Sequence, residues 1–223
     1  MKKALLTLLI IVSIFTITGC ANKDSKAFKE DYEKLNGVVN SAGKEHRKLN
    51  ISEDNPFVEV SADEIVKKID NKETFYVYFG STLCPWCRSV IESAIKIAKE
   101  KNIKTIYYVD IWDDSGKEIL RDKYEVKNKK LEKTIDGTDS YKKLLENFNS
   151  LLRDYSVTDA NDNNKEYSTG EKRIYAPNYF YIKEGKAIKL TTGKSEKLTD
   201  ARGELTEEIK NDQEKLFRDF FTN

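Results

Sequence analysis

The amino-acid sequence predicts an α/β fold in which helices flank a central mixed sheet. A continuous aromatic and β-branched run, 75–79, is typical of a strand that is buried on both faces. Residues at helical spacing over 87–101 and a second strand-like run, 105–109, follow it, and this order indicates a parallel βαβ unit. Two later runs, 178–182 and 187–191, are separated by a short glycine turn and predict a hairpin that closes the sheet.

Further elements are expected on both sides of this unit. A short strand is predicted at 57–60, and Ser61 with Glu64 three residues later forms a capping-box pattern that opens a helix through Ile69. The last helix is expected over 205–220, where the apolar residues recur on one face and Thr206 or a neighbour provides the N-cap.

Residues 113–172 interrupt the alternation of strands and helices. They are charged, lack strand signals and carry one amphipathic pattern over 141–155. A polar stretch, 159–168, is expected to be a loop. The sequence therefore predicts a mainly helical insertion at 113–172.

Length and charge limit the classes of function. The chain has 223 residues, enough for one domain with an insertion, and we expect that domain to span 56–223. Charged residues make up 35% of the chain, but the formal net charge is only +1. A nearly balanced surface has no basic field to attract nucleic acid, so we expect no nucleic-acid partner.

The first 20 residues differ from the rest of the chain. Lys2 and Lys3 precede an uncharged stretch that is shorter than the roughly 20 apolar residues of a membrane span. The stretch ends in Ile-Thr-Gly-Cys and resembles a bacterial lipoprotein signal, in which 1–19 is the signal peptide and Cys20 carries lipid. The alternative is an uncleaved N-terminal anchor. Both place the rest of the chain on the outer face of the cytoplasmic membrane.

Residues 20–55 are expected to form a polar tether between the lipid and the domain. Charged residues dominate this segment, and only a short helix is predicted, around 28–35. In the alternative, Phe28, Tyr32 and Leu35, which share helical spacing, pack back onto the domain.

Two cysteines, Cys84 and Cys87, are the most informative residues. The chain has three cysteines, so these are the thiols that remain once Cys20 carries lipid. A disulfide that closes a loop of about four residues stabilises a fold very little, so the pair indicates chemistry. A structural zinc ion needs four ligands, and the only histidine, His46, lies far away in the sequence; haem attachment needs a histidine where Arg88 stands. The motif predicts thiol–disulfide exchange without a metal or cofactor.

The pair also lies at a favourable place in the predicted fold. Cys84-Pro85-Trp86-Cys87 follows the strand 75–79 and begins a helix, where unpaired backbone N–H groups favour a thiolate. Pro85 stiffens the turn and loses no hydrogen bond at the first helical position.

This motif, the strand before it and Ala176-Pro177 before the hairpin resemble the thioredoxin-like superfamily over 56–223. The resemblance implies a thioredoxin-like fold with a helical insertion, in which the bond before Pro177 is cis and lies against the cysteines, while the backbone of Ala176 pairs with substrate. The alternative for Pro177 is an ordinary proline at a strand start. The insertion is similar to that of DsbA-like oxidases. Membrane tethering is similar to Gram-positive lipoprotein oxidoreductases and bacteriocin-transport accessory proteins.

The resemblance also implies a role for each residue of the motif. Cys84, as the more exposed thiol, is expected to attack the substrate, and Cys87 to resolve the mixed disulfide. Trp86 either offers an aromatic surface to substrate or packs over the edge of the site. Arg88 either favours the thiolate or is a solvated helix residue.

One position departs from the thioredoxin pattern. Thioredoxins keep a buried acid six residues before the first cysteine of the motif, and here that residue is Tyr78. Asp110, at the end of the next strand, is an imperfect substitute. We therefore expect an altered redox poise, with a direction of electron flow that the sequence does not fix.

The sequence thus predicts a membrane-tethered, extracytoplasmic thiol–disulfide oxidoreductase that acts on protein thiols or disulfides with a separate redox partner. The alternative is a non-catalytic thioredoxin-fold module, for example an accessory to peptide or bacteriocin export, that binds through 113–172. The first is favoured because both thiols of Cys84 and Cys87 would be idle in the second.

Overall fold

A computed structural model describes residues 18–162 and 164–221, with side chains from residue 23 onward. Most of the predicted signal peptide, 1–19, and the side chain of Cys20 lie outside this part of the chain. Within it, no helix is both long enough and apolar enough to cross a membrane. The described residues form a mixed α/β fold with five α-helices.

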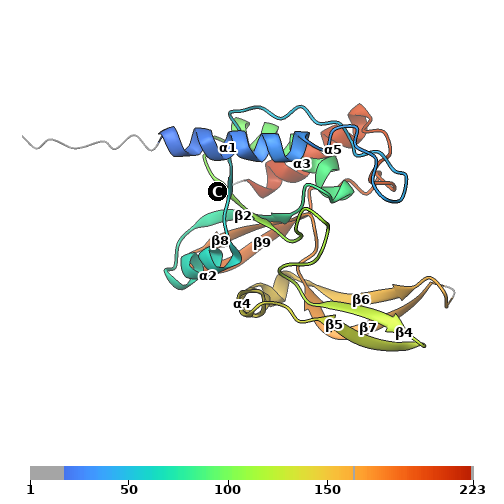
Figure 1. The fold of residues 1–223 in the computed structure, drawn as a ribbon. Helices are drawn as coiled ribbons and strands as arrows, with labels where there is room; N and C mark the ends of the chain where they lie inside the picture. Colours follow the sequence, from blue (N-terminus) through green and yellow to red (C-terminus); the bar gives the residue numbers. More distant parts are fainter. Residues whose placement is uncertain (1–17, 163, 222–223) are drawn as a thin grey trace, which may run out of the picture.

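The central sheet has five strands in the order β1-β3-β2-β8-β9 (Figure 1). β1, β3 and β2 are parallel, whereas β8 pairs antiparallel with both β2 and β9. The predicted βαβ unit and the closing hairpin are confirmed. The strands are β1 (Phe57–Glu59), β2 (Phe75–Gly80), β3 (Ile106–Asp110), β8 (Asn178–Lys183) and β9 (Lys186–Thr191).

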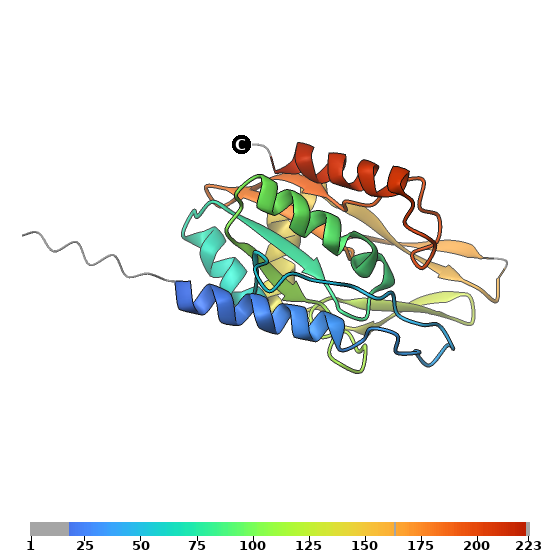
Figure 2. The ribbon, with the colours of Figure 1, turned by 90° about the horizontal axis from the view of Figure 1, so that it is seen from above.

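Helices cover both faces of this sheet. α1 (Thr18–Glu33), α3 (Pro85–Glu100) and α5 (Glu207–Phe220) lie on one face, and α2 (Ala62–Asp70) and α4 (Asp139–Phe148) on the other (Figures 1 and 2). All six residues of β2 are buried, because its alternate side chains enter the two apolar clusters that these helices form with the sheet. The predicted cap residues are also confirmed: α2 begins with a complete capping box at Ser61, and Thr206 caps α5.

The segment 113–172 is not mainly helical, which corrects the prediction. Besides α4 and a 3₁₀ turn (Asn149–Leu151) it contains two antiparallel hairpins. Their strands carry charged residues and are largely exposed, so they lack the alternating apolar pattern that marks a half-buried strand. The predicted loop 159–168 overlaps the turn of the second hairpin. The strands are β4 (Lys123–Lys127), β5 (Lys130–Ile135), β6 (Arg153–Asp159) and β7 (Lys165–Arg173).

The predicted tether is also corrected, because much of it belongs to the folded unit. α1 lies along the sheet face that α3 and α5 share (Figure 2). Phe28 and Tyr32 are buried, and the ring of Phe28 stacks on that of Phe57 with centroids 4.4 Å apart. The apolar spacing in this segment therefore marks a packed helix, the alternative that the sequence left open.

Candidate functional site

The two cysteines lie together at the N-terminus of α3. Cys84 is the N-cap residue, and its Sγ accepts a hydrogen bond from the backbone N–H of Cys87 at 3.4 Å. Its thiol also donates to the carbonyl oxygen of Ala176 at 3.7 Å. Both thiols are free. Cys84 is the more exposed of the two, as expected, but only 4% of its surface is accessible, against 0% for Cys87.

This geometry shifts the pKa values of the two thiols in opposite directions. Hydrogen bonding from the Cys87 thiol, and then from the N–H groups of Cys87 and Trp86, lowers the pKa of Cys84 against the opposing effect of burial. Burial raises the pKa of Cys87 well above its ordinary value, and its interaction with Cys84 adds to the rise. The pair therefore combines a thiol that ionises more readily than usual, Cys84, with one that ionises less readily, Cys87.

Three of the other predicted residues join this pair. The Ala176–Pro177 bond is cis, as the resemblance implied, and it places the Ala176 carbonyl against Cys84. Trp86 is half-buried and packs against the core beside the cysteines, with the Lys194 ammonium 4.3 Å from its ring centroid. The structure thus brings Cys84, Cys87, Trp86 and Ala176 into one site.

Arg88 has neither of the roles considered for it. It is 1% exposed, and its guanidinium turns toward the segment that follows α1. It donates to the carbonyls of Tyr32 (2.8 Å) and Arg47 (3.0 Å) and to the side-chain oxygen of Asn36 (2.9 Å). A third carbonyl, that of Thr82, accepts at 3.3 Å. Arg88 therefore fastens the N-terminal segment to α3.

Tyr78 fills the position of the expected acid at the back of the site. Its ring is fully buried and stacks on those of Tyr179 and Tyr108 at 4.3 and 5.3 Å. Its hydroxyl is 2.9 Å from that of Tyr32 on α1, and it lowers the pKa of Cys87 against the larger opposing effect of burial. A Cβ on Gly80 would lie 2.1 Å from this hydroxyl, so the ring fits only beside glycine.

Asp110 does not take over the role of the acid. Its carboxylate accepts from the Tyr108 hydroxyl at 2.6 Å and from the Trp112 N–H at 3.0 Å, and burial raises its pKa. Tyr78 is thus the titratable side chain from β2 that interacts with the Cys87 thiol.

The Tyr32–Tyr78 hydrogen bond predicts a measurable coupling. Each single change to phenylalanine leaves the other hydroxyl buried without its partner, so each is expected to cost about 1–3 kcal/mol of unfolding free energy. The double change removes both hydroxyls and should cost clearly less than the sum. Urea unfolding of the four proteins measures the cycle, and additive losses would contradict the contact.

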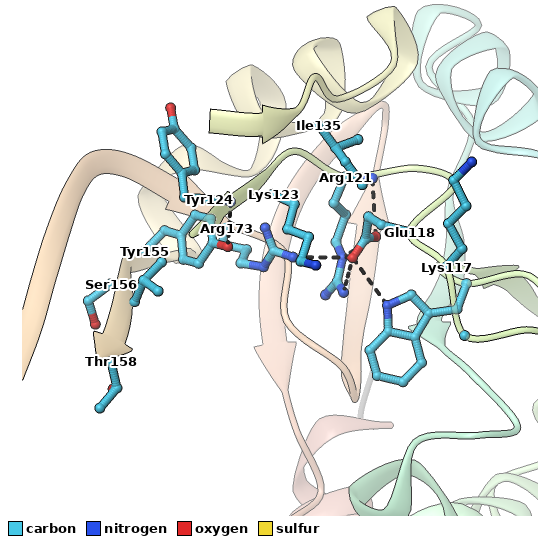
Figure 3. Close-up of a pocket in the computed structure, with 13 residues that line it drawn as sticks. Lys117, Glu118, Arg121, Lys123, Tyr124, Ile135, Tyr155, Ser156, Thr158 and Arg173 are labelled. Atoms are coloured by element: carbon cyan, nitrogen blue, oxygen red, sulfur yellow. Dashed lines mark hydrogen bonds and ion pairs between the residues drawn. The ribbon is translucent and has the colours of Figure 1, made fainter. Parts of the chain in front are cut away.

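A buried ionic network lies beside this site, and no pattern in the sequence indicated it. Arg121 and Arg173 both reach the carboxylate of Glu118, whose Oε2 is 2.7 Å from Arg121 Nη2 and 3.3 Å from Arg173 Nη2 (Figure 3). The indole N–H of Trp112 donates to the same oxygen at 3.1 Å. Arg121 also favours the Cys84 thiolate through its charge. Trp112, Glu118 and Arg121 precede β4, and only Arg173, at the end of β7, is brought to them by the fold.

Within the described residues, no cluster of three or more histidine, cysteine, aspartate or glutamate side chains is arranged to hold a metal ion. Comparison with models of known protein families and with curated proteins gives no match. A proposal for function therefore rests on the sequence motifs and on the geometry of the site.

Proposed function

We propose that the protein is a thiol–disulfide oxidoreductase with a thioredoxin-like fold, and that it acts on protein substrates through Cys84 and Cys87. The observation that carries the proposal is the opposite pKa shift of two thiols at the start of one helix. The sheet order and the position of the cis bond before Pro177 support the fold assignment.

In the reducing direction, the Cys84 thiolate attacks a substrate disulfide. One substrate sulfur leaves as a thiolate and is protonated, and a mixed disulfide between Cys84 and the other sulfur remains. Cys87 then loses its proton and attacks the Cys84 sulfur, which releases the second substrate thiolate and closes the Cys84–Cys87 disulfide. Two electrons and two protons pass to the substrate, and a redox partner must return them to the enzyme.

The oxidising direction uses the same steps in reverse. A substrate thiolate attacks the Cys84–Cys87 disulfide at Cys84, and a second substrate thiolate releases Cys84, so that the substrate disulfide forms. The redox partner then reoxidises the pair. We place this reaction on the outer face of the cytoplasmic membrane, where lipid on Cys20 holds the protein, because of the lipoprotein-like N-terminus.

The proposal is tested with Cys87→Ser, which removes the resolving thiol but keeps the nucleophile. Cells that express this variant are expected to accumulate mixed disulfides between Cys84 and substrate proteins, visible as reducible adducts on non-reducing gels. Cys84→Ser is the matched control and should form none. The proposal fails if Cys87→Ser gives no adducts and the unmodified protein neither reduces insulin nor oxidises protein thiols.

The reduction potential of the pair then assigns the direction of electron flow. Equilibration with glutathione measures this potential: about −270 mV is expected for a reductant and about −120 mV for an oxidant.

A further inference from the structure

A pocket of about 470 Å³ opens between the two hairpins (Figure 3). Trp112 lines the pocket and packs against the same core as Cys84. Arg121, also in the lining, donates to the carbonyl of Ile174 at 3.0 Å, two residues before Ala176. Its volume is in the range of ligand-binding sites, and the charge of Arg121 acts on the Cys84 thiol.

The floor of the pocket is rigid and already neutralised. The side chains of Glu118 and Arg121 are 5% exposed and that of Arg173 is 8% exposed. Glu118 accepts from both arginines and from an indole N–H, so its oxygens are occupied. Arg173 also lies over the Tyr155 ring, 4.1 Å from the centroid. This network holds the two hairpins in a fixed geometry.

The mouth of the pocket carries excess positive charge. Arg121 and Arg173 in the lining are balanced by Glu118 and by Asp122, which pairs with Arg173 at 3.3 Å, so the excess comes from Lys117 and Lys123. Glu118 is taken up by the arginines, and both lysines are exposed. The ion pair of Lys123 with Glu125 is itself solvent-exposed and therefore weak. A ligand with carboxylates would complement this rim.

The wall of the pocket is the edge of a strand. Ser156, Val157 and Thr158 are consecutive in β6, and all three line the pocket. Neighbouring side chains of a strand point to opposite faces, so three in a row can border one space only along the strand edge. Among the described residues β6 pairs with β7 alone, so this edge has no second strand. Its length, about 10 Å, fits an extended segment of about three residues.

We propose that this pocket binds an extended, acidic segment of the protein substrate. The segment adds to the edge of β6 through backbone hydrogen bonds, and its carboxylates face Lys117 and Lys123. This inference rests on the proposed function, which states that the substrate is a polypeptide. It adds the place where that polypeptide docks and the charge that it carries. Docking here holds the segment that flanks the reacting sulfur of the substrate next to Cys84.

Peptide binding tests the inference without any redox step. The probe is a fluorescein-labelled peptide of alternating threonine and glutamate, and its polarisation is measured with the Cys84→Ser/Cys87→Ser protein. The same peptide with lysine for glutamate tests the charge, and a version N-methylated at every second residue tests strand addition. Both are expected to bind at least about tenfold more weakly than the acidic peptide. Equal binding of all three peptides would overturn the inference.

Charge reversal on the protein locates the site. Lys117→Glu/Lys123→Glu is expected to weaken binding of the acidic peptide about tenfold. The matched control is Lys130→Glu/Lys143→Glu, which makes the same charge change at exposed positions outside the pocket and should alter binding by no more than about twofold. If both variants lose peptide binding equally, the loss is caused by the net charge of the protein and the proposed site is wrong.

A redox assay separates this inference from the proposed function. Lys117→Glu/Lys123→Glu should still reduce or oxidise a small-molecule disulfide or thiol at the rate of the unmodified protein, because both cysteines are intact. If the unmodified protein is redox-active but the Cys84→Ser/Cys87→Ser protein does not bind the acidic peptide, the docking site is wrong and the proposed function stands. If the peptide binds but no redox activity exists, the proposed function is wrong and the binding site stands.

Discussion

Replacing Cys84 with serine is expected to lower the rate of thiol–disulfide exchange by at least about a thousandfold. The reason is that Cys84 is the thiol whose pKa is lowered, whereas Cys87 is fully buried and its pKa is raised. Serine at 84 replaces the N-cap sulfur with a hydroxyl oxygen that can accept the same hydrogen bond, so α3 should still begin at the same place and the fold should survive. Insulin reduction and thermal unfolding, measured on the same samples, separate lost chemistry from lost structure.

The pH dependence of alkylation tests the cause of this pKa difference. The pKa of Cys84 lies below its ordinary value, so its reaction with iodoacetamide should reach half of its maximal rate below the pH of about 8.5 that is normal for a thiol. Hydrogen bonding from the Cys87 thiol is the largest cause. Cys87→Ala should therefore move this midpoint upward, and Cys87→Ser, which keeps a donor, should move it less. A midpoint that Cys87→Ala leaves unchanged would contradict the contact.

The sequence predicted the central unit because its signals are local. The run 75–79 is continuous and apolar, and the capping box at Ser61 lies directly before its helix, so period and cap alone identify these elements. Cys84 and Cys87 were found for the same reason, because their spacing places both thiols at one helix end.

The corrections arise where tertiary contacts outweigh local pattern. The strands of the two hairpins are charged, and the network beside them joins Glu118 and Arg121, three residues apart, to Arg173, which is more than 50 residues further along the chain. Tyr155, which continued the apolar spacing of α4, instead lies in β6 with its ring under Arg173. The contacts of Arg88 could not be predicted from the sequence, because three of its four acceptors are backbone carbonyls, which every residue has.

Arg88→Met is expected to cost about 3 kcal/mol of unfolding free energy. Methionine fills a similar volume but donates nothing, so the carbonyls of Tyr32, Thr82 and Arg47 would lose their donor in a buried place. Each orphaned acceptor costs about 1–3 kcal/mol, and the sum is smaller than the parts because the segment relaxes. The midpoint of thermal unfolding should fall by about 6–12 °C.

The control for this change is Arg218→Met on α5. The guanidinium of Arg218 is exposed and forms an ion pair with Glu100 at 2.9 Å, so stability should hardly change. Arg88→Lys keeps the charge but loses the planar guanidinium that reaches several acceptors. Its stability should therefore lie between those of Arg88→Met and Arg218→Met. Equal stability of Arg88→Met and Arg218→Met would show that the N-terminal segment is not fastened by this side chain.

The loss at Arg88 should also affect the redox pair, because three of the four acceptors of Arg88 lie on the N-terminal segment that carries Tyr32. When α1 detaches, Tyr78 loses its hydrogen-bond partner, and the packing around Cys87 opens on that side. Hydrogen exchange should therefore rise first over residues 23–50, before global unfolding. In the same variant Cys87, which is inaccessible in the native fold, should become alkylated at a measurable rate. If hydrogen exchange in α1 becomes faster while Cys87 is still not alkylated, the two regions are independent and the predicted coupling is wrong.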